Sequence, residues 1–237
     1  MRKAPAIFAS GIGADRMGRL AALFDVGTAV CDVAMTGTFS EHALLLTASP
    51  ENGVLDDLFR RGMGRCIEVD GYSDPEVREA ACRADRSDLF LSLTTATTYR
   101  GSVSRWVMQG IGLRQVLTPE RRDDIELALQ EAISNAVLHG NLQMDSLDGV
   151  SVAALERFHA ETALRLELPA FADRRVEVAV TLGRAVTIEV VDQGVGYIWS
   201  PRGGGVASGR GIALIATISD DFEVLQNGRC MRMSFAL

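Results

Sequence analysis

Three side chains that could do chemistry recur at intervals of four residues in the stretch Ile125–Asn141. Its sequence is IELALQEAISNAVLHGN, in which Glu131, Asn135 and His139 stand at i, i+4 and i+8. On a helix this spacing predicts a carboxylate, an amide and an imidazole in one row. A carboxylate placed there can take a proton from an attacking hydroxyl or water. The amide oxygen is a hard ligand of the kind that Mg²⁺ prefers beside phosphates.

The same stretch contains the apolar stripe that a helix needs to hold this row in place. Thr118, Pro119 and Glu120 predict the helix start, and Gly140-Asn141 predict its end. A solvated face of an ordinary core helix would show the same pattern, so the chemistry depends on motifs farther along the chain. The stripe consists of Ile125, Leu129, Ala132, Ile133, Ala136 and Val137.

Two glycine clusters follow in the C-terminal third of the chain. Alternating residues predict a strand pair at Val176–Leu182 and Val186–Val191, and the second strand runs into Asp192-Gln193-Gly194-Val195-Gly196. An acid at a strand end can accept hydrogen bonds from an exocyclic amine, while the glycines let the backbone approach a flat ring. Ser208-Gly209-Arg210-Gly211 opens a predicted helix, 212–218, whose free N–H groups would suit phosphate oxygens.

Each cluster alone has a plain structural explanation, because DxGxG is often a turn and GRG before a helix is a common packing device. Their order argues against coincidence: ExxxNxxxHG comes first, then DxGxG, then GxG before a helix. A closing hairpin is predicted at Phe222–Leu225 and Cys230–Leu237, with Asn227-Gly228 as a two-residue turn.

In this order the motifs resemble those of the GHKL (Bergerat-fold) ATPase family, which includes gyrase, histidine kinases and mismatch-repair ATPases. EAISNAVLHGN looks like the N box, VVDQGVGY like the first glycine box and SGRGIALI like the second. The resemblance covers residues 89–237 and is greatest to the anti-sigma-factor serine/threonine kinases. It implies an α+β sandwich, a mostly antiparallel sheet backed by helices, with ATP held between the helical layer and a lid.

The resemblance also implies a role for each matching residue. Glu131 would be the general base, Asn135 the Mg²⁺ ligand that bridges the phosphates, and Asp192 the reader of the adenine amino group. His139 would steady the helix end and the nucleotide loop. The remaining nucleotide contacts would come from Gly194 and Gly196 at the base and ribose, Gly209 and Gly211 at the phosphates, and Arg210 or Arg202 at the γ-phosphate.

Three features depart from the family pattern. The predicted lid between Tyr197 and Ser208 is short and glycine-rich, and Arg229-Cys230 follow Gly228 where the family commonly has a threonine. Residues 142–173 form an insertion, within which Val152–Leu168 has helical periodicity. One flank of that helix is expected to be either ordinary core or a dimer or partner surface: Val152, Leu155, His159, Thr162 and Leu166.

Strand–helix alternation in the first ninety residues predicts a mainly parallel sheet covered by helices. We therefore expect an α/β protein with two domains, 1–88 and 89–237, joined at the charged break Ala84–Asp88. A strand at Leu89–Leu93 and a helix at Arg100–Leu113 begin the second domain. In the first domain, strands are predicted at 4–10, 28–33, 43–47 and 66–69, and helices at 15–24, 53–61 and 75–84.

The front domain loosely resembles the C-terminal half of a response-regulator receiver domain. Thr47, Gly62, Val69 and the helix start Asp74-Pro75-Glu76 stand at matching positions. The acidic pair and the lysine of that family are missing, and Asp32 is the one candidate phospho-acceptor. The resemblance implies a degenerate receiver-like module used for protein contacts.

Composition excludes some classes of function. A net charge of −7 argues against non-specific nucleic-acid binding, which needs a cationic surface. No apolar run is long enough to span a bilayer, and we expect no membrane partner. The four cysteines, Cys31, Cys66, Cys82 and Cys230, lack CxxC spacing, so we expect buried reduced thiols in a cytoplasmic protein.

The function expected from these features is that of an ATP- and Mg²⁺-dependent serine/threonine kinase. Its partner would be an anti-sigma-antagonist-like protein, with release or capture of a sigma-like factor, and a homodimer is possible. One alternative is a non-catalytic ATP-binding module that switches partners by nucleotide occupancy. A second is a histidine-kinase core fragment, for which His42 would be the phosphate acceptor although its surroundings read as a strand.

Overall fold

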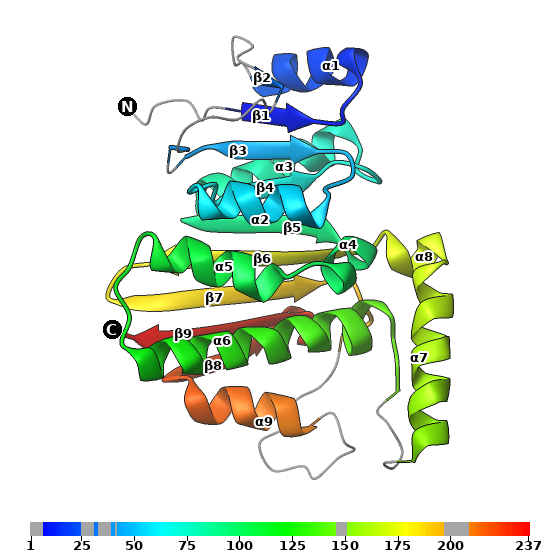
Figure 1. The fold of residues 1–237 in the computed structure, drawn as a ribbon, viewed down its shortest axis with the longest axis vertical. Coiled ribbons are helices and arrows are strands. Elements are labelled where there is room, and N and C mark those ends of the chain that lie inside the picture. Colours follow the sequence, from blue (N-terminus) through cyan, green and yellow to red (C-terminus); the bar gives the residue numbers. More distant parts are fainter. Residues whose placement is uncertain (1–6, 25–30, 33–38, 41, 146–150, 197–208) are drawn as a thin grey trace.

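The described part of the chain is organised around one nine-stranded sheet (Figure 1). The computed structural model describes residues 7–24, 31–32, 39–40, 42–145, 151–196 and 209–237. The strands, in spatial order, are β2 (Cys31–Asp32), β1 (Ile7–Ser10), β3 (Leu44–Thr47), β4 (Arg65–Glu68), β5 (Leu89–Thr94), β6 (Arg175–Leu182), β7 (Ala185–Asp192), β9 (Cys230–Ala236) and β8 (Asp221–Leu225).

Strand β5 joins two halves of this sheet. From β2 to β5 every neighbouring pair is parallel, and from β5 to β8 every pair is antiparallel. The predicted α/β fold with a mostly antiparallel, helix-backed C-terminal sheet is therefore confirmed. The predicted boundary between 88 and 89 falls between neighbouring strands of a continuous sheet, because β4 pairs with β5.

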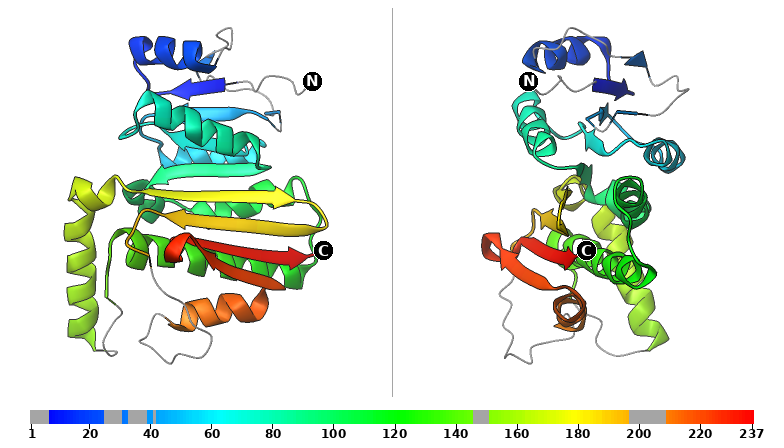
Figure 2. Two further views of the ribbon diagram at one scale, coloured as in Figure 1. Left: turned by 180° about the vertical axis from the view of Figure 1, so that it is seen from behind. Right: turned by 90° about the vertical axis from the view of Figure 1, so that its left-hand side faces the viewer.

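Helices cover most of one face of the sheet and only the parallel half of the other (Figures 1 and 2). On the first face lie α2 (Asn52–Arg60), α5 (Val103–Gly112), α6 (Pro119–Ser134) and α9 (Gly209–Ile218). On the second face α1 (Ala14–Phe24) and α3 (Asp74–Asp85) cover the parallel half. Within the described residues, no helix covers the second face of β7, β9 and β8, where residues such as Thr187, Glu189 and Arg232 are half-exposed.

The larger core fills the space between the sheet and the first layer of helices. All six residues of the predicted stripe, Ile125 to Val137, are buried there. Trp106 is fully buried, stacks on Phe59 with ring centroids 6.0 Å apart and donates a 2.6 Å hydrogen bond to Asp56. This layer holds α6 against the sheet, so the row that begins with Glu131 has a rigid support.

The crossover through α3 has an uncommon hand. Both β3–α2–β4 and β4–α3–β5 join parallel neighbours and step in the same direction across the sheet. Since α2 and α3 lie on opposite faces, the two crossovers have opposite hands, and Figure 1 shows that the one through α3 is left-handed. Nearly all crossovers between parallel strands of one sheet are right-handed, so the crossover through α3 is an exception.

Several predicted boundaries were wrong. The helix predicted at Arg100–Leu113 is α5 and begins only at Val103, because Gly101 is extended and ends a separate short helix, α4 (Thr95–Arg100), which was not predicted. Helix α3 extends into the first two residues of the predicted linker, as far as Asp85. The final hairpin turns over four residues, since Leu225 pairs with Cys230, and Gln226 and Asn227 both have positive φ in the short 3₁₀ segment η2 (Gln226–Gly228).

The insertion forms α7 (Val152–Leu166) and α8 (Pro169–Ala172), which stand at one end of the sheet. The predicted flank faces the core only in its second half. Val152 is 74% and Leu155 45% exposed, whereas Thr162 is buried and Leu166 packs against the larger core. A dimer or partner surface stays a prediction.

The cysteines were expected to be buried thiols. Cys66 and Cys230 are buried free thiols, but Cys82 is exposed, and the side chain of Cys31 lies outside the description. Burial raises the pKa of Cys230 to about 11 and raises that of Cys66 as well, so these two remain protonated at neutral pH.

Candidate nucleotide-binding site

The central helix changes its winding where the chemistry begins. Thr118 caps it as predicted, its hydroxyl accepting a 3.2 Å hydrogen bond from the Arg121 N–H. Helix α6 is α-helical to Ser134, and Asn135–Asn141 continue as a π-helix, η1. The wider turn aligns backbone groups five residues apart, as in the 2.8 Å bond from the Leu142 N–H to the Val137 carbonyl. Single π-helical turns occur frequently at functional sites.

A small cavity at the end of α6 brings the predicted motifs together. It takes residues from η1, the end of β7, α9 and the start of β9. Its volume of about 60 Å³ is below the 300–1,000 Å³ of a typical small-molecule site, so the described walls by themselves do not enclose a whole nucleotide. The lining residues are Asn135, His139, Gly140, Asp192, Gly196, Ile212, Gly228 and Met231.

The end of the central helix and the first glycine cluster approach each other so closely that only glycine fits at three positions. A Cβ on Gly140 would lie 2.5 Å from the Cγ of Asp192. A Cβ on Gly194 would overlap the carbonyl oxygen of Gly140, and one on Gly196, whose φ is +78°, would overlap that of Asn227. These three glycines therefore allow η1, the β7 end and the last hairpin to close on one another.

Asp192 is an acid held largely out of water at the cavity wall. It is 7% exposed, and its Oδ1 accepts a 2.7 Å hydrogen bond from the Gly194 N–H. Burial raises the pKa of Asp192 to about 6, against the lowering effects of that hydrogen bond and of the charges on Arg229 and Arg174. At neutral pH the carboxylate is therefore ionised and able to accept further hydrogen bonds.

The second glycine cluster meets the polar row of the central helix. Helix α9 begins at Gly209, and a Cβ on Gly211 would lie 2.5 Å from Oε2 of Glu131 and 3.5 Å from Nδ2 of Asn135. That Nδ2 is buried and has no hydrogen-bond partner among the residues that the structure describes. An orphaned buried amide costs about 1–3 kcal/mol, which argues for a missing acceptor. A phosphate oxygen at the start of α9 would supply it.

Residues 93–235, well over half of the chain, match the family model of the histidine kinase-like ATPase domain. The chain belongs to this ATPase family. A search of curated proteins found no match. Membership supports an ATP-binding protein of signalling type, and the resemblance to GHKL ATPases predicted from the three motifs is confirmed.

The described part of this ATPase holds most of the predicted site residues in one place. Glu131 and Asn135 lie at the start of α9, and His139 lines the cavity with its Nδ1 2.8 Å from the Met144 carbonyl oxygen. Gly209 and Arg210 are in the first turn of α9, and the side chain of Arg210 lies outside the description. Arg202 and the predicted lid, residues 197–208, lie outside the described residues.

The structure also includes the two residues that were considered as phosphate acceptors, His42 and Asp32. His42 is exposed in a turn just before β3, where a strand was expected, and far along the sheet from Asp192. Asp32 is in β2, and its side chain lies outside the description. Within the described ranges, no helix is long and apolar enough to cross a membrane, and no group of three His, Cys, Asp or Glu residues could hold a metal ion.

Sequence reasoning missed Asn141, which was taken only as a helix end. It is fully buried, and its side chain hydrogen bonds to Thr95, to the Arg175 carbonyl and to the Gln193 N–H. The sequence offered one sign of this role, because Asn141 lies between the apolar residues Leu138 and Leu142 and is therefore expected to be buried. A buried amide needs hydrogen-bond partners.

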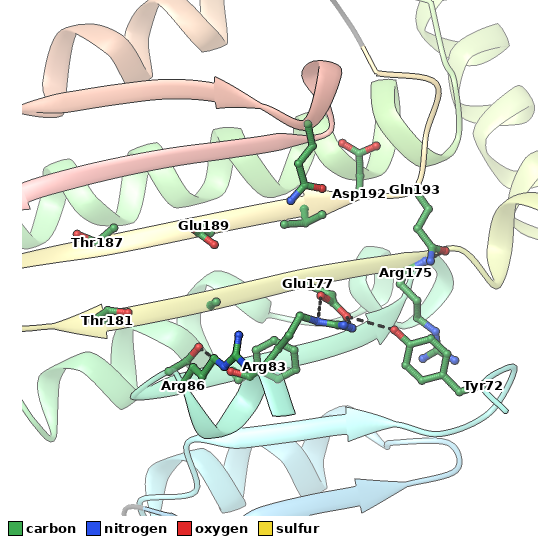
Figure 3. Close-up of a pocket in the computed structure, with 15 residues that line it drawn as sticks. Tyr72, Arg83, Arg86, Arg175, Glu177, Thr181, Thr187, Glu189, Asp192 and Gln193 are labelled. Carbon is green, nitrogen blue, oxygen red and sulfur yellow. Dashed lines mark hydrogen bonds and ion pairs between the residues drawn. The ribbon is translucent and has the colours of Figure 1, made fainter. Parts of the chain in front are cut away.

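Sequence reasoning also missed a polar joint between the two halves of the sheet, defined here as Tyr72, Arg83, Ser92 and Glu177, of which Figure 3 shows Tyr72, Arg83 and Glu177. Glu177 on β6 accepts hydrogen bonds of 2.9 and 2.6 Å from Arg83 of α3, and of 3.2 Å from both Tyr72 and Ser92. Burial and the nearby Glu177 raise the pKa of Tyr72, so it stays a neutral donor. A groove of about 530 Å³ runs from this joint along β6 and β7 to Asp192 and Gln193.

Proposed function

We propose that this ATPase is a serine/threonine protein kinase of the anti-sigma-factor type, acting on an antagonist-like protein partner. The observation that carries the proposal is the contact of Gly211 with both Glu131 and Asn135. This contact supports the proposal because the carboxylate of Glu131 and the amide of Asn135 lie beside the first turn of α9. These are the three groups that transfer of a γ-phosphate to a hydroxyl needs.

In this proposal the nucleotide lies along the wall from Asp192 to α9. The ionised carboxylate of Asp192 accepts a hydrogen bond from the adenine amino group, and the glycines beside it admit the base. The phosphates take backbone N–H groups from the first turn of α9, where the helix dipole favours negative charge. His139 holds the loop after the helix through the Met144 carbonyl.

Mg²⁺ fits the residues that are present. It is a hard ion that keeps several waters and is commonly held by one or two protein oxygens together with phosphate oxygens. The Asn135 amide could supply the protein oxygen, and its Nδ2 would then find its acceptor on a phosphate. When bound, the metal supplies charge neutralisation for the transferred phosphoryl group.

Glu131 then acts on the protein substrate. Its carboxylate takes the proton from a serine or threonine hydroxyl, whose oxygen forms a bond to the γ-phosphorus while the bond to the β-phosphate oxygen breaks. The products are a phosphoprotein and ADP. Glu131 is partly exposed, so an incoming hydroxyl could reach it.

The test is transfer of labelled phosphate from Mg-ATP to candidate antagonist domains. We expect Glu131→Gln to lower the rate of phosphate transfer about a hundredfold or more, as for the loss of a general base. The affinity for ATP should stay within about threefold of wild type. Glu126→Gln on the same helix is the matched control and should transfer normally. Binding without transfer in the wild type, with partner affinity changed by ATP, would instead establish the non-catalytic partner switch.

We further propose that residues 1–88 form a receiver-like module joined to an ATPase domain at 89–237. Within residues 1–88 the parallel strands have the order β2-β1-β3-β4, and β5 of the ATPase domain completes the order 2-1-3-4-5 that doubly wound folds of the flavodoxin and receiver type share. The crossover through α3 departs from the right-handed rule for parallel strands of one sheet, which supports a junction between two units at this point. Receiver chemistry is not proposed, since the acidic pair and lysine are missing.

A further inference from the structure

We propose that Asn141 is the positioning residue that sets the adenine-reading segment Asp192–Gly194, and through it the preference for adenine over guanine. The inference rests on the ATP-binding part of the proposed function and not on phosphate transfer. Asn141 does not line the cavity itself, so its effect must pass through the residues that it holds.

The side chain of Asn141 is fully buried at a point where three elements meet. Its Nδ2 donates to Thr95 Oγ1 at 2.8 Å, at the start of α4, and to the Arg175 carbonyl at 2.9 Å, at the start of β6. Its Oδ1 accepts from the Gln193 N–H at 2.7 Å, immediately after β7. Both donor hydrogens and the acceptor are therefore used, which is complete satisfaction for a buried amide.

The bond to Gln193 matters most because of where Gln193 stands. Its backbone follows Asp192 directly and precedes Gly194, whose N–H holds the Asp192 carboxylate. The Gln193 side chain is also fixed, its Oε1 accepting a 2.8 Å bond from the Arg175 N–H. Asn141 and Arg175 thus hold the residue between the adenine-reading acid and its glycine from two sides.

The orientation of Asp192 decides which base fits. Adenine presents an amino group at its position 6, a hydrogen-bond donor, while guanine presents a carbonyl oxygen there, an acceptor. An ionised carboxylate attracts the first and repels the second. A site built to hydrogen bond one group rejects an analogue that lacks it, provided that the acceptor is held in position.

The test measures binding of ATP, GTP and inorganic triphosphate to the full chain by displacement of a fluorescent ATP analogue. In Asn141→Asp the Gln193 bond survives but both donated bonds are lost, and in Asn141→Ser the side chain no longer reaches Gln193. We expect the ratio of ATP to GTP affinity to fall about tenfold or more in Asn141→Ser, with a smaller fall in Asn141→Asp. Affinity for inorganic triphosphate should stay within about twofold of wild type.

Thr162→Val is the matched control for the loss of a buried hydrogen bond away from the site. The Thr162 hydroxyl is 1% exposed and donates to the Phe158 carbonyl at 2.8 Å in α7. This variant should lose stability without changing the base preference. Should the Asn141 variants fold poorly, Thr95→Val removes one partner of the amide and should give a partial fall in the same ratio.

A uniform loss of affinity for all three ligands, or an unchanged ATP-to-GTP ratio, would overturn the inference and leave Asn141 a structural residue only. The outcome is distinguishable from failure of the kinase proposal. If the wild type prefers ATP but transfers no phosphate, the kinase proposal is contradicted. The inference about Asn141 still stands in that case, provided that the Asn141 variants lose the preference for ATP.

Discussion

Gly211 lies directly against the carboxylate of Glu131, so close that a Cβ at this position would come within 2.5 Å of Oε2. These residues are eighty positions apart in the chain and on different helices, α6 and α9. Their contact joins the polar row of the central helix to the second glycine cluster. A side chain at this position would displace the Glu131 carboxylate, so glycine leaves that carboxylate beside the first turn of α9.

Gly211→Ala is expected to displace the Glu131 carboxylate and to weaken ATP binding about tenfold or more, because the methyl group takes space beside the first turn of α9 that a phosphate would face. The overlap is with the end of a flexible side chain, which can move, so the free energy of unfolding should change by less than about 1 kcal/mol. Titration calorimetry with ATP and urea unfolding measure the two effects. Gly183→Ala is the control, since nothing lies within 4 Å of its Cβ position; equal effects of both substitutions would contradict the assignment.

Asp192→Asn is expected to stabilise the unliganded protein at pH 7.5 by about 1–3 kcal/mol. Because burial raises the folded pKa from 3.8 to about 6, the folded state binds more protons than the unfolded state between these values. Wild-type stability therefore falls as pH rises from about 4 to 6. The advantage of the asparagine should grow over that window and level off above it. Urea unfolding at a series of pH values checks this, and a pH-independent difference would refute it.

The preference for ATP over GTP should decline as pH falls below about 6. Protonation of Asp192 removes the negative charge that attracts the adenine amino group and repels the guanine carbonyl. The ratio of the two affinities is the quantity to measure, since phosphate titration affects both nucleotides alike. In Asp192→Asn the ratio should be low and independent of pH. A wild-type ratio that stays constant from pH 7.5 to 5 would count against Asp192 as the base reader.

The polar joint is expected to stabilise the sheet where its two halves meet. Glu177 is 9% exposed and has four hydrogen bonds, so Glu177→Gln, which cannot satisfy both guanidinium donors, should cost about 1–3 kcal/mol in the free energy of unfolding. The half-exposed pair Arg232–Glu189 offers the comparison, and Glu189→Gln should cost less than about 1 kcal/mol. Denaturant unfolding measures both changes in the free energy of unfolding. Similar losses in the two variants would show that the polar joint stabilises the protein no more than a surface ion pair does.

Local pattern was sufficient for much of the fold. The stripe from Ile125 to Val137 predicted which side of the central helix is buried, and alternation predicted β6 and β7 to within about a residue. The start of α5 was predicted three residues too early because helical periodicity does not show the break at Gly101, which lies close against the ring of Trp106. The four-residue turn was missed for a similar reason, since Gln226 has a positive φ that its residue type does not favour.

The sequence by itself determined the chemistry available at this site. Its helical period put Glu131, Asn135 and His139 in a row, and its glycines stood where a nucleotide would need free backbone. The tertiary structure decided which of these groups meet and what holds them. Asn141 and Gln193 are 52 residues apart, and Glu177 and Arg83 are 94 apart. No local periodicity encodes such pairings, because a buried polar group is satisfied by whichever partner the packing of distant elements brings to it.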